Sequence, residues 1–169
     1  MRSIMFGMLL AGSLLLAGCG GQSAASQPRL SGEGKQFALA EEPAGAIGIL
    51  EYREATSPPT EVALWGKIGG SKETWSPTSA EFMLIDPTFE MDAGGHVCTS
   101  DNCPFCKGKD EKHKAQAIVS LVDREGQVPK VKARQLLPLE EGQIVVVRGQ
   151  AEVNSLGQLI VRTNGVYVR

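Results

Sequence analysis

Aromatic residues make up only 5% of this 169-residue sequence, and basic residues are not in excess. The chain has 17 Lys and Arg against 19 Asp and Glu, a formal net charge of −2 at pH 7. Proteins that bind single-stranded nucleic acid combine a positively charged groove with aromatic rings on which the bases stack. The composition supplies neither feature, so we do not expect a nucleic-acid partner.

Common catalytic signatures are also missing. The sequence has no His-Glu-x-x-His motif of metalloproteases and no Gly-x-Ser-x-Gly nucleophile elbow. It has no phosphate-binding glycine-rich loop either, because Gly66, Gly69 and Gly70 follow the pattern of a strand and its turn. We therefore expect a binding or structural protein rather than an enzyme.

The apolar run from Ile4 to Ala17 is too short to span a bilayer. It follows a short positive start and ends in Leu16-Ala17-Gly18-Cys19. This ending resembles the lipobox of bacterial lipoprotein signal peptides, in which small residues precede a cysteine that receives the lipid. The resemblance implies a signal peptide over residues 1–18, a lipid on Cys19 and a partner membrane in the bacterial cell envelope.

Residue 20 is glycine rather than aspartate. By analogy with enteric bacteria, this favours anchoring in the outer membrane, facing the periplasm, over retention in the inner membrane. Residues 19–42 are rich in Gly, Ser and Gln towards their start, a composition typical of flexible linkers. We expect them to tether a domain over residues 43–169, a usual domain size.

Five segments of that domain have the patterning of β-strands, bounded by Gly, Pro, Asn and Asp turns. The short segment Pro43 to Ala55 has helical spacing before the first strand, and Val131 to Leu139 is a crossing segment between the third and fourth. Asn164-Gly165 predicts a bulge or break in the last strand. The predicted strands are Glu61–Ile68, Ala80–Asp86, Ala115–Asp123, Gln143–Val153 and Gln158–Val168.

This pattern predicts an all-β fold, a five-stranded barrel of the oligonucleotide/oligosaccharide-binding (OB) type. Gly66 and Gly149 lie inside strands, where a small barrel needs glycine to bend. A small open sandwich is the alternative. The run Gly66 to Ser71, then Ala80-Glu-Phe and Asp86-Pro87, resembles uncharacterised predicted lipoproteins of planctomycete-type bacteria. That resemblance implies a barrel in the envelope and brings no activity with it.

A cysteine-rich loop lies between the second and third predicted strands. With Cys19 assigned to lipid, three cysteines remain, and three cannot all pair within one chain. His96, Cys98, Cys103 and Cys106 supply one imidazole and three sulfurs, a closed tetrahedral set for zinc. The two-residue spacing between Cys103 and Cys106 lets both sulfurs reach one ion. The sequence therefore predicts a structural zinc site of the Cys₃His type.

The cysteines of this loop could also take part in other chemistry. Two of the three cysteines can form a disulfide, and thiolates also suit exchangeable Cu(I). The spacing Cys98-x₄-Cys103-x₂-Cys106 matches three ligands of plant-type iron–sulfur clusters, but no fourth cysteine follows. Cys103-Pro-Phe-Cys106 resembles the glutaredoxin tetrapeptide, although the residues after it offer no apolar stripe for a helix. His113, in a lysine-rich run, is an alternative to His96 as the fourth ligand.

We thus expect a lipid-anchored envelope protein. It would consist of a small barrel with a zinc-type loop, and it would bind an envelope protein or a small ligand. Envelope handling of copper or zinc is the alternative, and thiol–disulfide exchange by Cys103 and Cys106 is a further one.

Overall fold

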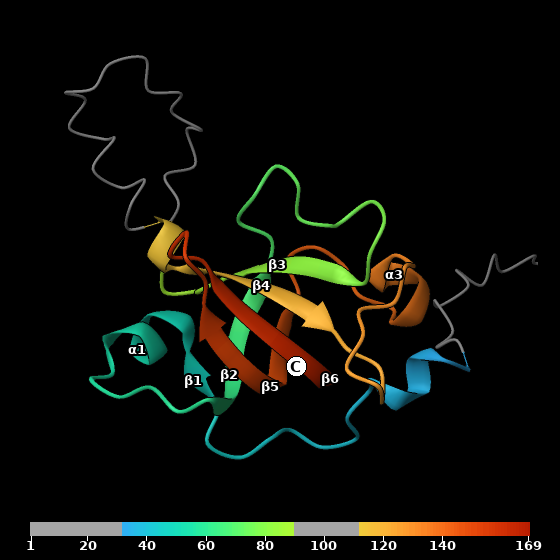
Figure 1. Ribbon diagram of the computed structural model, residues 1–169, viewed down its shortest axis with the longest axis horizontal. Helices are drawn as coiled ribbons and strands as arrows, with labels where there is room; N and C mark the ends of the chain where they lie inside the picture. Colours follow the sequence, from blue (N-terminus) through green and yellow to red (C-terminus); the bar gives the residue numbers. More distant parts are fainter. Residues whose placement is uncertain (1–31, 90–111) are drawn as a thin grey trace, which may run out of the picture.

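The computed structural model describes residues 32–89 and 112–169. Cys19, the signal peptide and the loop carrying His96, Cys98, Cys103 and Cys106 lie outside these residues. The described chain is mostly β-strand (Figure 1). Its elements are η1 (Gly34–Gln36), β1 (Ile47–Gly48), α1 (Ile49–Glu54), β2 (Glu61–Ile68), β3 (Glu81–Ile85), β4 (Gln116–Leu121), α3 (Ala133–Leu136), β5 (Ile144–Val153) and β6 (Leu159–Val168).

The predicted five-stranded barrel is confirmed. The strands run in the order β2-β3-β4-β6-β5, and β5 pairs with β2 to close the sheet, while β1 adds to β2 from outside. Neighbours are antiparallel except β4 with β6 and β1 with β2, which are parallel. Closure excludes the open sandwich. α3 falls within the predicted crossing segment between β4 and β5.

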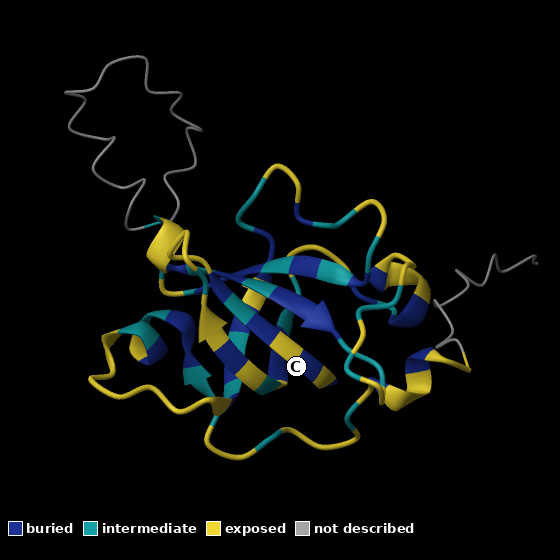
Figure 2. Ribbon diagram, in the orientation of Figure 1, coloured by how far each residue is buried: buried dark blue, intermediate teal, exposed yellow. Residues whose placement is uncertain are grey.

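Alternation along the strands builds the core. In β2, buried and more exposed residues alternate from Val62 to Ile68, as the period of two requires (Figure 2). Phe82 and Leu84 of β3 face the same interior as Val119 of β4. α1 and α3 lie on opposite sides of the barrel (Figure 1), and each adds buried residues to the core, among them Ile49 and Leu136.

Two glycines allow the barrel to close. A Cβ on Gly149 would lie 2.1 Å from the backbone oxygen of Arg162, and one on Gly66 would lie 3.1 Å from Cβ of Leu84. At Gly149 the partner on β6 jumps from Gly165 to Thr163, so Asn164 is the extra residue of a bulge. The predicted bulge at Asn164-Gly165 is therefore confirmed, and Gly66 and Gly149 lie where a side chain would crowd the neighbouring strand.

The N-terminal part of the domain differs from the prediction. The predicted helix from Pro43 to Ala55 is shorter, because residues 47 and 48 pair with β2 and only Ile49–Glu54 are helical. Packed structure also begins within the predicted tether. Phe37 is fully buried in the core, and the backbone N–H of Leu39 donates to Val166 of β6.

Candidate functional site

The predicted metal-binding loop leaves and rejoins the barrel between β3 and β4. These strands pair with Ile85 opposite Gln116, and the N–H of Asp86 donates to the carbonyl of Ala115 at 2.8 Å. Both ends of the loop are therefore fixed to one rigid strand pair. The predicted ligands His96, Cys98, Cys103 and Cys106 remain a prediction, because they lie outside the described residues.

Asp86 anchors the end of β3 to the short helix α1. Its Oδ2 accepts the backbone N–H of Leu50 at 2.9 Å, and its Oδ1 accepts the N–H and hydroxyl of Thr88 at 2.9 and 2.6 Å. Only 2% of the residue is exposed. A carboxylate at the start of a helix satisfies backbone donors that have no partner inside the helix.

The charge of Asp86 is stabilised by these hydrogen bonds. Burial by itself would raise the pKa of its carboxyl group. The donors from Leu50, Thr88 and Ile49 outweigh burial, so the pKa lies below the ordinary value. Asp86 is thus a buried anion. It has a structural role at the start of the predicted metal-binding loop, directly after β3.

His113 is the one predicted ligand candidate that the structure describes. It lies in a short helical stretch, residues 112–114, just before β4. Within residues 32–89 and 112–169, no three His, Cys, Asp or Glu side chains gather as a metal would require. His113 therefore belongs to no such group of three in the described part of the chain.

Two hollows adjoin at the start of β4, one over the outer face of β3 and β4 and the other beside the turn after β2, and both are lined by His113 and Gln116. We call the first the apolar hollow; its volume is about 280 Å³. It is lined by Met83, His113, residues 116–118 and residues 156–159. We call the second the basic hollow; its volume is about 420 Å³. It is lined by residues 70–73, Lys112, His113 and Gln116.

The side of the apolar hollow formed by residues 156–159 belongs to the β5–β6 hairpin. Asn154 Oδ1 accepts the N–H groups of Leu156 and Gln158 at 2.9 and 3.0 Å, which closes the predicted turn. Both terminal nitrogens of Arg53 on α1 donate to the carbonyl of Gly157 at 3.2 Å. The turn is thus tied to the barrel, and Leu156 at its tip is 81% exposed.

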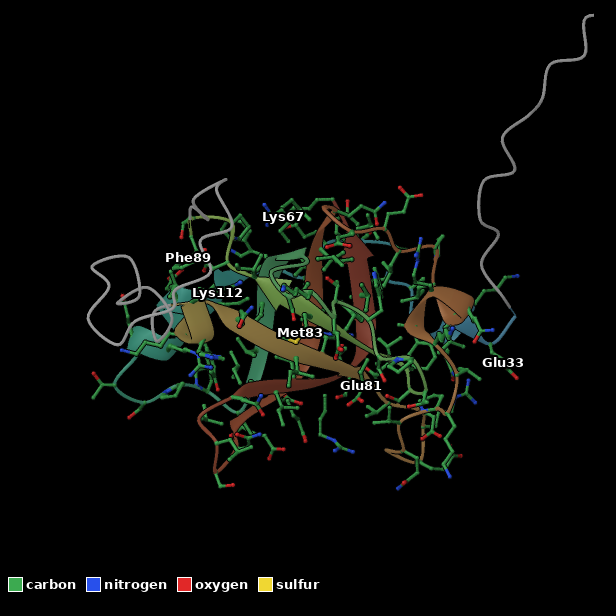
Figure 3. All side chains as sticks on the ribbon, turned by 90° about the horizontal axis from the view of Figure 1, so that it is seen from above. Glu33, Lys67, Glu81, Met83, Phe89 and Lys112 are labelled. Carbon is green, nitrogen blue, oxygen red and sulfur yellow. The ribbon has the colours of Figure 1, made fainter. Side chains whose placement is uncertain are left out.

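The floor of the apolar hollow comes from the register of β3 and β4. Met83 pairs with Ile118, and both are partly exposed on the outer face. One step along, Glu81 pairs with Ser120, and its carboxylate accepts the hydroxyls of Ser120 and Ser79 at 2.7 and 2.6 Å. In Figure 3, Met83 lies between Glu81 on one side and Lys112 on the other.

This face could not be predicted directly from the sequence. Met83 and Ile118 occupy outward positions of their strands, where alternation predicts polar residues. Two apolar residues at outward positions were the available signal, but only their pairing across the strands shows that they meet. The basic hollow had a partial signal in the lysine-rich run around His113.

No protein-family model matches the chain, and no curated protein matches it. The similarity to planctomycete-type lipoproteins accordingly stays a prediction from sequence. No helix among the described residues is long and apolar enough to cross a membrane.

Proposed function

We propose that the protein is a lipid-anchored binding module of the bacterial cell envelope, without catalytic activity, that presents the outer face of β3 and β4 to a ligand. The observation that carries this proposal is the pair of adjoining hollows on that face, which both contact His113 and Gln116. Strands 2 and 3 of an OB barrel, here β3 and β4, are the face on which such barrels commonly bind ligands. Fold alone does not assign a ligand, so the proposal depends on the hollows.

In this proposal the loop between β3 and β4 is stabilised by zinc, held by His96, Cys98, Cys103 and Cys106. Support comes from the ligand set and its spacing. Four ligands within eleven residues would close the coordination sphere, which favours a structural metal over an exchangeable one. Handling of copper or zinc is the second candidate, favoured by the same thiolates.

Metal analysis tests the zinc loop. We expect about one zinc per chain in full-length Cys19→Ser protein purified without added metal, with three thiols reactive only after chelation. Cys19→Ser removes the one thiol outside the loop. If zinc is present but its removal leaves the protein folded, the result would favour metal handling. If no metal is present and only one thiol is free, the loop holds a disulfide instead of the predicted zinc site.

Two histidine variants identify the fourth ligand in the same assay. His96→Ala is expected to release zinc to a chelator that the unmodified protein resists, because it removes a ligand from a closed site. His113→Ala is the matched control and is expected to retain zinc. The reverse result would assign His113 to the metal and move the site towards the start of β4.

Lipid attachment is tested by labelling in a bacterial host. We expect radiolabelled palmitate to enter the protein, and Cys19→Ser to abolish the label completely, because the lipid is joined to that sulfur. Cys98→Ser is the control and should leave the label unchanged. Label that persists in the Cys19→Ser protein would contradict the predicted anchor.

A further inference from the structure

The apolar and basic hollows adjoin, and we call the pair the depression. They share His113 and Gln116 in their lining, so a ligand longer than either hollow would contact both. Gln116 is held in place between them, since its side-chain amide donates to the carbonyl of Gly70 at 2.6 Å. The depression crosses from the turn after β2, over β3 and β4, to the β5–β6 hairpin.

The basic end brings together cations from distant parts of the chain. Lys72 follows β2, and Lys112 precedes β4. Among the residues that the structure describes, neither lysine forms an ion pair. Glu73 also lines this hollow, and the carboxylate of Glu141, outside the lining, accepts the hydroxyl of Thr74 at 3.1 Å. The two lysines are thus the groups of the lining that an anion would contact favourably.

The other end has an apolar floor within a mixed lining. Met83 and Ile118 form that floor and Leu156 lies at its edge, while Gln116 and Gln158 add polar groups. The nearest acidic side chain further along β3, Glu81, already accepts hydroxyls from Ser79 and Ser120. A ligand with one apolar group and one anionic group would therefore be oriented in a single direction, with its charge towards Lys72 and Lys112.

We propose that this depression binds a small amphiphilic anion, with a phosphate group between Lys72 and Lys112 and an alkyl chain over Met83 and Ile118. This inference rests on the proposed binding function and specifies its ligand class. Lysine binds phosphate as a point charge, so the interaction needs no bidentate geometry. Burial of each methylene is expected to tighten binding about threefold to fourfold until the apolar hollow is full.

The test uses the full chain carrying Cys19→Ser, so that no attached lipid competes for the apolar hollow. Octyl phosphate, octyl glucoside and inorganic phosphate are titrated by calorimetry below the concentrations at which micelles form. Octyl phosphate is expected to bind at least about tenfold tighter than either of the others, because only it occupies both ends.

Two double-lysine variants distinguish binding at the basic hollow from general attraction to a positively charged protein. Lys72→Gln with Lys112→Gln is expected to weaken octyl phosphate about tenfold and to leave octyl glucoside unchanged. Lys67→Gln with Lys130→Gln removes the same charge from exposed lysines that do not line either hollow, and should change octyl phosphate less than about twofold. Leu156→Ser should weaken both octyl compounds by a similar factor, and the exposure of Leu156 leaves the fold intact.

Three other outcomes would contradict the proposed ligand class, the proposed function or both. Equal affinity for octyl phosphate and octyl glucoside, with both sensitive to Leu156→Ser, would reject the anionic ligand and keep the binding face. Equal losses in the two lysine pairs would show general attraction to a basic surface and also reject the inference. Absence of binding by all three compounds would reject the inference and remove the support that the hollows give to the proposed function.

Discussion

Replacement of Asp86 by asparagine is expected to lower the free energy of unfolding by about 2–3 kcal/mol at pH 7. Asparagine keeps the shape but removes the charge, and its amide nitrogen cannot accept a hydrogen bond. One of the two partly buried donor groups, from Leu50 or from Thr88, then loses its acceptor. Urea unfolding followed by circular dichroism measures the difference.

The same variant should change how stability depends on pH. Because the pKa of Asp86 is lower in the folded protein than in the unfolded chain, its stabilising contribution is complete above the unfolded pKa of about 4. The contribution is lost as pH falls from there through the folded pKa. Unmodified protein should thus lose stability more steeply below pH 4 than Asp86→Asn.

Glu152→Gln provides the control, because Glu152 is exposed on β5. Its stability and acid profile should follow the unmodified protein within about 0.5 kcal/mol. An Asp86→Asn protein as stable as this control would mean that the carboxylate does not anchor α1. Parallel acid profiles for all three proteins would assign the acid sensitivity to other groups.

Replacement of Gly149 by alanine is expected to destabilise the barrel by about 3 kcal/mol or more, enough to prevent folding if the margin is small. The new Cβ would meet the backbone oxygen of Arg162 at 2.1 Å, and backbone in a paired strand cannot rotate away as a side chain can. The bulge at Asn164 would have to shift or the β5–β6 ladder open.

Two further glycine-to-alanine variants provide a scale for the loss of stability in Gly149→Ala. Gly66→Ala should cost less, because its Cβ would lie 3.1 Å from a side-chain atom of Leu84. Gly32→Ala should be close to neutral, since nothing lies within 4 Å of its Cβ position. Thermal unfolding of the three variants should give the order Gly149, Gly66, Gly32 from most to least destabilised. A Gly149→Ala protein as stable as Gly32→Ala would contradict the close contact between β5 and β6.

The strands themselves could be predicted because their signal is local. β2 has the predicted bounds, Glu61–Ile68, since one face of a closed barrel is buried and a period of two therefore appears in the sequence. The turn Asn154 to Gly157 and the bulge at Asn164-Gly165 were also visible as local chemistry. The short pairing of Ile47 and Gly48 was not, because two residues carry no periodicity.

Burial of Phe37 could not be predicted for a different reason. Most of its neighbours are polar or small, as in a linker, and the backbone bonds between residues 37–39 and Val166 bring this segment onto β6. The candidate site has the same origin. Met83 and Ile118 are separated by 34 intervening residues and meet only through strand register, and Lys72 and Lys112 line the same hollow only through the pairing of β3 with β2 and β4.

The sequence by itself determined the all-β class, the strand positions and the glycines that a tight barrel requires, because alternation and turn chemistry are written residue by residue. It also predicted a lipidated Cys19 and the zinc ligands His96, Cys98, Cys103 and Cys106. Tertiary structure decided the closure of β2 on β5, the anchoring of α1 by Asp86 and the adjoining hollows on β3 and β4. These features depend on contacts between residues far apart in the chain, which no local pattern encodes.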